Sequence, residues 1–146
     1  MQYRTMTETD LDRVVPLYVA YYNETEGGVW TYQTAYKRIH QVWSHEDSFC
    51  LLMEKDGEIL GFDMGNMEQF DDLVAYDLVE ILIFAEHQGK GYGTLLMREL
   101  ERQVKALGAS LIQLKAVNDE KHNKFYGKLG YYDSTNLTLK GKFLEG

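Results

Sequence analysis

The sequence ILIFAEHQGKGYG at residues 81–93 decides the fold. Its first four residues are all apolar, which is typical of a strand near the centre of a sheet. Three glycines, Gly89, Gly91 and Gly93, then precede an amphipathic helix. In such an arrangement backbone amides converge on an anion at the positive end of the helix dipole. The stretch therefore predicts an anion-binding loop in an α/β fold, although a glycine turn that only reverses the chain has the same composition.

Two common phosphate loops do not fit these glycines. The Walker pattern G-x-x-x-x-G-K-[ST] is absent, and the spacing of Gly89, Gly91 and Gly93 does not match the dinucleotide pattern G-x-G-x-x-G. The pattern that does fit is Q-x-x-G-x-G, which begins at Gln88.

Before this loop the patterns predict a short strand, two helices and three strands. Pro16 lies inside the first helix, which begins near Leu11, and is expected to kink it or to delay its start. Asp56-Gly57 is typical of a tight hairpin turn. The predicted strands cover residues 3–6, 49–53, 59–67 and 75–84, and the second helix runs from Thr31 to about residue 45.

After the loop, apolar residues recur at helical spacing. Leu96, Leu100, Val104 and Leu107 share one helix face, and Gly108 is placed to end that helix. A strand at 111–117, a helix at 119–129 and a final strand at 131–139 follow. The prediction is a single α/β domain over residues 1–146, with a mixed, mostly antiparallel sheet flanked by four helices.

The composition excludes several classes of protein. The chain has 146 residues and a formal charge of −8, which argues against a nucleic-acid partner bound through phosphates. It has no apolar run of bilayer length and no signal peptide at its start, so no membrane partner and a cytoplasmic location are expected. Cys50 is the only cysteine and is expected in the core. The histidines, at 40, 45, 87 and 122, lack metal-ligand spacing, so no metal site is expected.

A second segment, VNDEKHNKFYGKLGYY at residues 117–132, completes a pattern with the loop. Together the two closely resemble the GCN5-related N-acetyltransferase (GNAT) family, whose loop reads [QR]-x-x-G-x-[GA] and whose late helix carries F-Y-x-K-x-G-[FY]. That second signature is matched here by Phe125, Tyr126, Lys128, Gly130 and Tyr131. The resemblance covers nearly the whole chain and implies a GNAT-like fold.

The resemblance also implies the donor and its binding residues. Acetyl-CoA would be the co-substrate, with its pyrophosphate on the backbone amides of Gln88, Gly89, Lys90, Gly91, Tyr92, Gly93 and Thr94. Backbone groups of Leu82, Ile83 and Phe84 would face the pantetheine and the acetyl carbonyl, while their side chains stay in the core. The family's usual asparagine is Asp119 here, so Asn118 and Asn123 are the neighbouring candidates for the pantetheine contact.

The chemistry requires a proton acceptor. An alkylamine with a pKa of about 10.4 costs roughly 4 to 5 kcal/mol to deprotonate near neutrality. Glu80 is the first candidate for the base, acting through water, and Asp77 is the second. Either carboxylate could instead lie on a solvated face or pair with a lysine or arginine. By resemblance Tyr126 would protonate the departing thiolate, and its alternative role is that of a packed tyrosine.

The predicted function is transfer of acetyl from acetyl-CoA to a primary amine, by direct attack in a ternary complex. The acceptor would be a small molecule or a peptide, and a homodimer is left open. In the resembled family the first two helices line the acceptor site. In this chain those helices are rich in aromatic residues, which could instead serve only to pack the core. The alternative function is a non-catalytic acyl-CoA-binding sensor or regulatory module.

Overall fold

The structure is a computed structural model that describes residues 1–145. The chain divides into two compact units, Met1–Lys115 and Ala116–Gly146. The first unit contains the whole sheet and three of the helices, and the second contains the last helix. The expectation of a single domain stays a prediction.

The elements follow the predicted order up to the last helix. In the first unit they are β1 (Gln2–Thr5), the 3-10 turn η1 (Glu8–Asp10), α1 (Leu11–Thr25), α2 (Tyr32–Trp43), β2 (Ser48–Lys55), β3 (Glu58–Gln69), β4 (Val74–Ile83), the 3-10 turn η2 (Ala85–His87), α3 (Tyr92–Ala106) and β5 (Leu111–Leu114). In the second unit the described residues contain α4 (Glu120–Lys128). None of these helices is both long enough and apolar enough to cross a bilayer.

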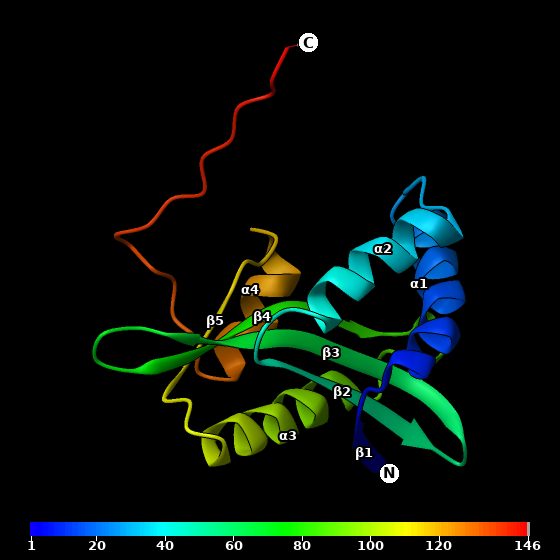
Figure 1. Cartoon of the computed structure of the whole chain (residues 1–146), viewed down its shortest axis with the longest axis horizontal. Coiled ribbons are helices and arrows are strands. Elements are labelled where there is room, and N and C mark those ends of the chain that lie inside the picture. The colour runs from blue at the N-terminus through cyan, green and yellow to red at the C-terminus, as the bar shows by residue number, and fades with distance from the viewer. Residues whose placement is uncertain (146) are drawn as a thin grey trace. The chain divides into compact units, whose positions relative to one another are not determined.

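One open sheet runs in the order β1-β2-β3-β4-β5 (Figure 1). The first three pairs of strands are antiparallel, and only β4 and β5 are parallel. This confirms the predicted α/β fold with a mostly antiparallel sheet. It also confirms that the apolar end of β4 lies inside the sheet, between β3 and β5.

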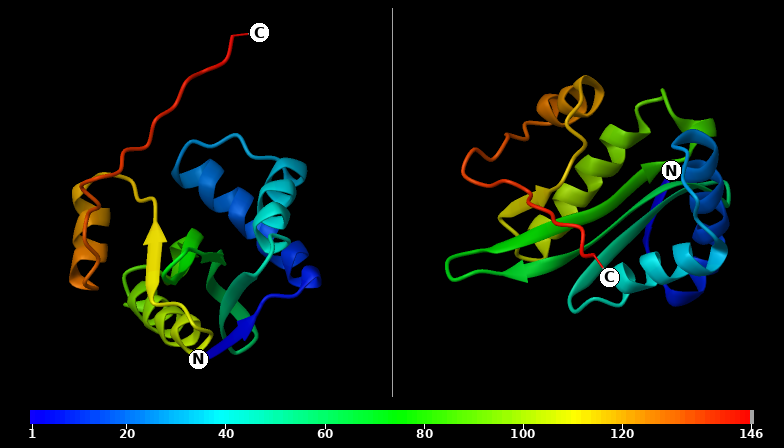
Figure 2. Two further views of the ribbon diagram at one scale, coloured as in Figure 1. Left: turned by 60° about the vertical axis from the view of Figure 1, so that its left-hand side comes forward. Right: turned by 90° about the horizontal axis from the view of Figure 1, so that it is seen from above.

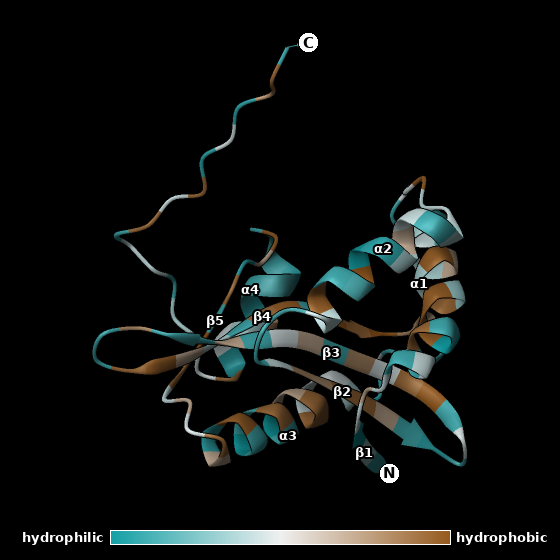
Figure 3. Ribbon diagram, in the orientation of Figure 1, coloured by the Kyte–Doolittle hydropathy of each residue, from teal (hydrophilic) through white to brown (hydrophobic). Residues whose placement is uncertain are grey.

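The sheet separates two layers of helices. On one face α1 and α2 pack against a core that includes Leu52, Phe62 and Leu82. On the other face α3 contributes Leu96 to a cluster with Met53 and Leu60. Both layers are visible in Figures 1 and 2, and Figure 3 shows apolar residues along β3 between them. Alternating side chains of the strands therefore serve two cores.

A β-bulge interrupts the pairing of β3 with β4. Met64 lies opposite Glu80, but the next residue of β3, Gly65, lies opposite Leu78, so Val79 is an extra residue in β4. Residues three apart on a regular strand point to opposite faces. Because of the bulge, Asp77 and Glu80 both lie on the face that α1 and α2 cover.

The N-terminal half confirms most of the local predictions. Thr31 caps α2 by accepting a hydrogen bond from the Thr34 amide at 3.1 Å. Asp56 and Gly57 form the hairpin turn with φ of 53° and 80°. The expected later start of the first helix is wrong, since α1 begins at Leu11, directly after η1, and continues through Pro16.

Three predictions after the loop are corrected. Leu107 is 59% exposed, because α3 ends at Ala106 and leaves it outside the apolar face. The strand predicted at 111–117 ends at Leu114, since its partner β4 bulges beyond Leu78. Residues 131–139 form no strand, because β5 pairs only with β4 and no described strand pairs with this segment.

Asp63 is an ionisable residue that lies in the buried core. It lies in the middle of β3 and is fully buried, and within residues 1–145 neither carboxylate oxygen accepts a well-formed hydrogen bond. Burial raises its pKa well above the usual range, and the nearby backbone amide of Leu51 opposes this effect only in part. Burial therefore favours the neutral form of Asp63 in the folded protein.

This burial predicts a stability that falls as pH rises. In the unfolded chain Asp63 loses its proton near pH 3.9, the ordinary pKa of an aspartate side chain. Above that pH the folded state binds one more proton than the unfolded state, so stability declines toward the raised folded pKa, by at most about 1.4 kcal/mol per pH unit. Asp63→Asn should remove this decline, and its advantage over the unchanged protein in urea unfolding should grow between about pH 4 and 7.

Asp71→Asn is the matched control, because it removes the same group from an exposed position. An Asp63→Asn advantage that stays constant with pH would contradict the neutral buried carboxyl.

Candidate functional site

The glycine loop has a backbone that other residues rarely adopt. Gly89 and Gly91 have φ of 77° and 82°, in the left-handed region, and Gly91 is the N-cap of α3. A side chain at either position would meet open space, so it is the backbone conformation that requires glycine.

The first turn of α3 presents unpaired amides. No side chain caps this helix, and the first helical bond runs from the Leu95 amide to the Gly91 carbonyl. Among the residues described, the amides of Tyr92, Gly93 and Thr94 have no backbone partner. Three unpaired amides at the positive end of a 15-residue helix have the geometry and the partial charge that suit an anion.

Gln88 attaches the loop to the strand before it. Its side-chain amide donates to the Ile83 carbonyl at 2.7 Å and to the Tyr21 hydroxyl of α1 at 3.2 Å. The Phe84 amide donates to the Leu60 carbonyl at 3.0 Å. The loop is thus held against the end of β4, while the Lys90 side chain is exposed.

β4 extends toward the loop beyond the end of β5. Their parallel pairing ends at Leu78 and Leu114, and β4 continues for five residues to Ile83. The Leu82 and Phe84 side chains are buried on the α1 and α2 face, and Ile83 packs on the α3 face. As expected, these side chains belong to the core, and only their backbone is available along this unpaired edge of β4.

Glu80 is held in place by residues of both covering helices. The Tyr18 hydroxyl and the Arg38 Nε both donate to Glu80 Oε1 at 3.1 Å. The Glu80 side chain is 10% exposed, and its second oxygen, Oε2, accepts no hydrogen bond from the described residues. Burial, followed by the nearby Glu80 charge, raises the pKa of Tyr18 and keeps its hydroxyl protonated. The arginine pairing that sequence analysis left open for Glu80 is therefore present.

Asp77 shares the sheet face of Glu80. It lies in register between Asn66 of β3 and Gln113 of β5, and it is half-buried. The structure therefore brings both candidate carboxylates to one face and does not choose between them.

Aromatic rings surround this part of α1 and α2. Tyr18 packs against Tyr22 at 4.6 Å and against Trp30 at 5.4 Å, measured between ring centroids. The Asn23 side chain donates to the Trp30 carbonyl at 2.8 Å, and the Trp30 amide donates back to it at 2.9 Å. Tyr18 is almost fully buried, so core packing accounts for it.

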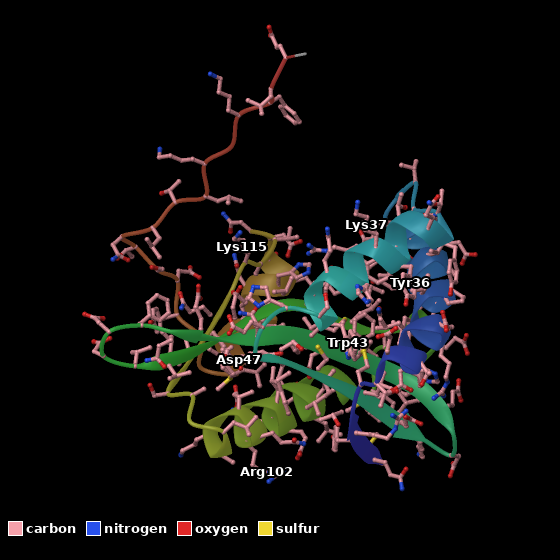
Figure 4. The ribbon with its side chains drawn as sticks, in the orientation of Figure 1. Tyr36, Lys37, Trp43, Asp47, Arg102 and Lys115 are labelled. Carbon is pink, nitrogen blue, oxygen red and sulfur yellow. The ribbon has the colours of Figure 1, made fainter. Side chains whose placement is uncertain are left out.

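A second aromatic row follows α2. Tyr32, Tyr36 and His40 stack in turn, with interplanar angles of 19° at both contacts, and Trp43 follows His40. Tyr36 and Trp43 lie on the α1 and α2 side of the sheet (Figure 4). This row is only partly buried, so its rings are in part accessible to solvent.

The second unit holds the other predicted residues. Tyr126 packs edge-on against Phe125 at 5.0 Å and Tyr131 at 5.8 Å between ring centroids, and burial raises its pKa. Asn123 donates to the Asn118 side-chain oxygen at 3.1 Å. Asp119 caps α4 by accepting from the His122 amide at 2.8 Å, a role that the family's asparagine would fill equally well.

Sequence spacing did not find the partners of Glu80, because Tyr18 and Arg38 are 62 and 42 residues away from it. It also missed Glu58, Glu86 and His87, whose ligand atoms lie within 4.8 Å of one another. These three line part of a 320 Å³ cavity with Arg13, Pro16, Leu17, Ile59 and Phe84. That cavity includes neither carboxylate candidate nor the glycines.

Comparison with known proteins shows which family model and which solved structures the chain matches. A model described as the Acetyltransferase (GNAT) family matches residues 11–131. A GNAT family acetyltransferase from Staphylococcus aureus is 22% identical, with a TM-score of 0.75 and coverage of 97% of this chain and 98% of that one. A ribosomal-protein-alanine N-acetyltransferase from Brucella melitensis is 15% identical, with a TM-score of 0.75 and coverage of 98% and 100%. An aminoglycoside acetyltransferase from an uncultured soil sample is 15% identical, with a TM-score of 0.69 and coverage of 99% and 98%.

The left-handed conformation of Gly91 predicts that a substitution there weakens ligand binding, whereas a substitution at a glycine outside the loop does not. Gly91→Ala places a side chain beside the open amides and strains the loop by about 1 to 2 kcal/mol. We expect coenzyme A binding, measured by calorimetry, to weaken about tenfold or more. Gly57→Ala is the matched control, since Gly57 has φ of 80° and equally open space. Equal weakening by both substitutions would contradict a role for the loop in binding.

Proposed function

Because the chain belongs to the acetyltransferase (GNAT) family, we propose that it transfers acetyl from acetyl-CoA to a primary amine by direct attack in a ternary complex. The observation that carries this proposal is the anion site at the start of α3, which Gln88 attaches to the open end of β4. A helix N-terminus beside an unpaired strand edge suits a ligand with a pyrophosphate and an amide-bearing arm.

The donor would extend from the loop along β4. The amides from Gln88 to Thr94 would bind its pyrophosphate, and the backbone from Leu82 to Phe84 would contact its pantetheine and thioester. Asn118 and Asn123 are candidates for a further pantetheine contact through their side-chain amides. Their mutual hydrogen bond uses one Asn123 N–H and the Asn118 oxygen, so the Asn118 nitrogen and the Asn123 oxygen could still bond the ligand.

Proton transfer from the amine falls to Glu80. Arg38 and Tyr18 fix Oε1, which leaves Oε2 to accept a proton from the ammonium, directly or through water. The amine nitrogen then attacks the thioester carbonyl, the carbon–sulfur bond breaks, and the sulfur leaves as a thiolate. As the amide forms, the nitrogen loses its second proton to water, and solvent restores the proton that Tyr126 donates. Asp77 on the same face is the second candidate for the base.

Tyr126 would return a proton to that thiolate. Its burial raises its pKa, so the hydroxyl carries its proton near neutrality and can act as the general acid. The proposed reaction therefore needs no covalent enzyme intermediate.

The acceptor would be an amine on a small molecule or a peptide, bound near the aromatic rings of α1 and α2. Those rings and the net charge of −8 suit a cationic group. The names of the relatives include both an aminoglycoside and a ribosomal-protein acetyltransferase, so both classes belong in the screen. We place the reaction in the cytoplasm, in keeping with the single cysteine.

The base assignment predicts a loss of turnover with binding retained. Glu80→Gln keeps the shape of the side chain but removes its proton acceptor, so kcat should fall about 10² to 10⁴-fold while coenzyme A still binds. Release of free thiol in the presence of an amine panel measures this. Glu68→Gln, an exposed residue at the end of β3, is the control. If Asp77→Asn alone gives the loss, the base is Asp77.

The acid assignment predicts a smaller loss. Tyr126→Phe keeps the ring packing and removes the hydroxyl, so kcat should fall on the order of 10²-fold. Tyr132→Phe, at an exposed tyrosine of the same unit, should leave the rate unchanged. Tight coenzyme A binding without thiol release by any tested amine would instead favour the acyl-CoA sensor.

A further inference from the structure

The salt bridge between Glu80 and Arg38 uses only part of the arginine. Arg38 donates through Nε to Glu80 Oε1 at 3.1 Å, and within residues 1–145 its two terminal nitrogens, Nη1 and Nη2, donate no hydrogen bond. The Arg38 side chain is 41% exposed, although that of Glu80 is only 10% exposed. The end of the guanidinium that carries Nη1 and Nη2 is therefore available to a second anion.

Two more polar atoms near this salt bridge have no partner in the described chain. One is Glu80 Oε2, and the other is the hydroxyl of Tyr22 on α1, which forms no hydrogen bond with the described residues. Burial raises the pKa of Tyr22, and the nearby charges of Glu80 and Arg38 act on it in opposite directions. One hydrogen-bond acceptor and donors from two residues therefore lie in the same part of the site.

The charge of the acceptor creates a difficulty at this salt bridge. An alkylamine is protonated near neutrality, so it reaches Glu80 as an ammonium. The carboxylate that must take its proton is already paired with Arg38, and an ammonium on Oε2 lies close to the guanidinium. Two positive charges at short range in a partly buried site repel each other. A negative charge on the acceptor itself would offset this repulsion.

Building on the proposed function, on which this inference rests, we propose that the acceptor is an α-amino acid. Its free carboxylate would bind Nη1 and Nη2 of Arg38 while its ammonium binds Oε2 of Glu80. A single carbon separates the two charged groups of an α-amino acid, which suits the short distance between the Glu80 and Arg38 charges. The four charges then alternate in sign around the site. A polyamine or an aminoglycoside would bring only positive charge to the guanidinium.

The residue type at position 38 supports a carboxylate ligand. The planar guanidinium of arginine binds a carboxylate through two parallel N–H···O bonds, which the ammonium of a lysine cannot form. Glu80 restrains the guanidinium at Nε, and the Tyr18 hydroxyl restrains Glu80 in turn at 3.1 Å. Both members of the pair are thus held before a ligand arrives, which lowers the entropy lost on binding.

The first test compares each amino acid with its own amide. In the thiol-release assay with acetyl-CoA, kcat/KM for free L-amino acids should exceed that for the matching α-carboxamides by about tenfold or more, since the amide lacks the charged partner of Arg38. The amide has the less basic nitrogen, so basicity alone would favour it. Polyamines, aminoglycosides and a peptide with a free N-terminus complete the panel. A higher kcat/KM for any of these than for every amino acid overturns the proposal.

Substitutions at Arg38 separate carboxylate binding from the support of Glu80. Both Arg38→Gln and Arg38→Lys should lower kcat for every amine, so the readout is the ratio of kcat/KM for the amino acid over its amide. Arg38→Gln should reduce this ratio about tenfold or more. Arg38→Lys should preserve part of it, because the positive charge remains. Lys37→Gln, at an exposed neighbour on α2 (Figure 4), should leave the ratio unchanged.

Binding provides a measurement that needs no turnover. Calorimetry in the presence of coenzyme A should detect the amino acid with the unchanged protein, and Arg38→Gln should weaken this binding about tenfold. Equal affinity for the amino acid and its amide, or a ratio of kcat/KM that Arg38→Gln leaves unchanged, overturns the proposal while the acetyltransferase function stands. Absence of thiol release with every amine overturns the proposed function, and the amino-acid acceptor fails with it.

Discussion

The geometry of the candidate site depends on the extra residue in β4. Val79 shifts the register against β3, which ends the pairing of β4 with β5 at Leu78 and turns Asp77 onto the face of Glu80. Across from this shift, a side chain at Gly65 would approach the Asp77 carbonyl to 2.1 Å and the Tyr76 ring to 2.7 Å. The close approach of the two strands thus requires glycine at position 65. The bulge accounts both for the end of the β4–β5 pairing and for the shared face of the two carboxylates.

Local constraints explain what could be predicted from the sequence. The glycine loop was predictable because left-handed backbone at Gly91 and an uncapped helix start depend on a few adjacent residues. The Thr31 cap and the Asp56-Gly57 turn were predictable for the same reason. The partners of Glu80 were not, since Arg38 reaches it only after the chain has folded two helices onto the sheet. The shared face of Asp77 and Glu80 could not be predicted either, because a spacing of three residues in a regular strand places the two side chains on opposite faces.

The segment at 131–139 shows a different limit. Its alternating pattern predicted a strand that the structure does not contain, because a strand exists only where a second backbone shares its hydrogen bonds. The pattern of side chains reports a tendency of the segment, whereas pairing depends on another segment that the pattern does not contain.

Unpaired backbone groups connect these observations. Most polar groups of a backbone find partners inside the fold, so the exceptions mark places where something else binds. In the first unit the exceptions gather at the start of α3 and along β4 beyond Leu78, where the proposed donor would supply the missing partners. The same requirement thus selects a ligand whose acceptor atoms match the convergent amides at the start of α3 and whose amide groups match the unpaired edge of β4.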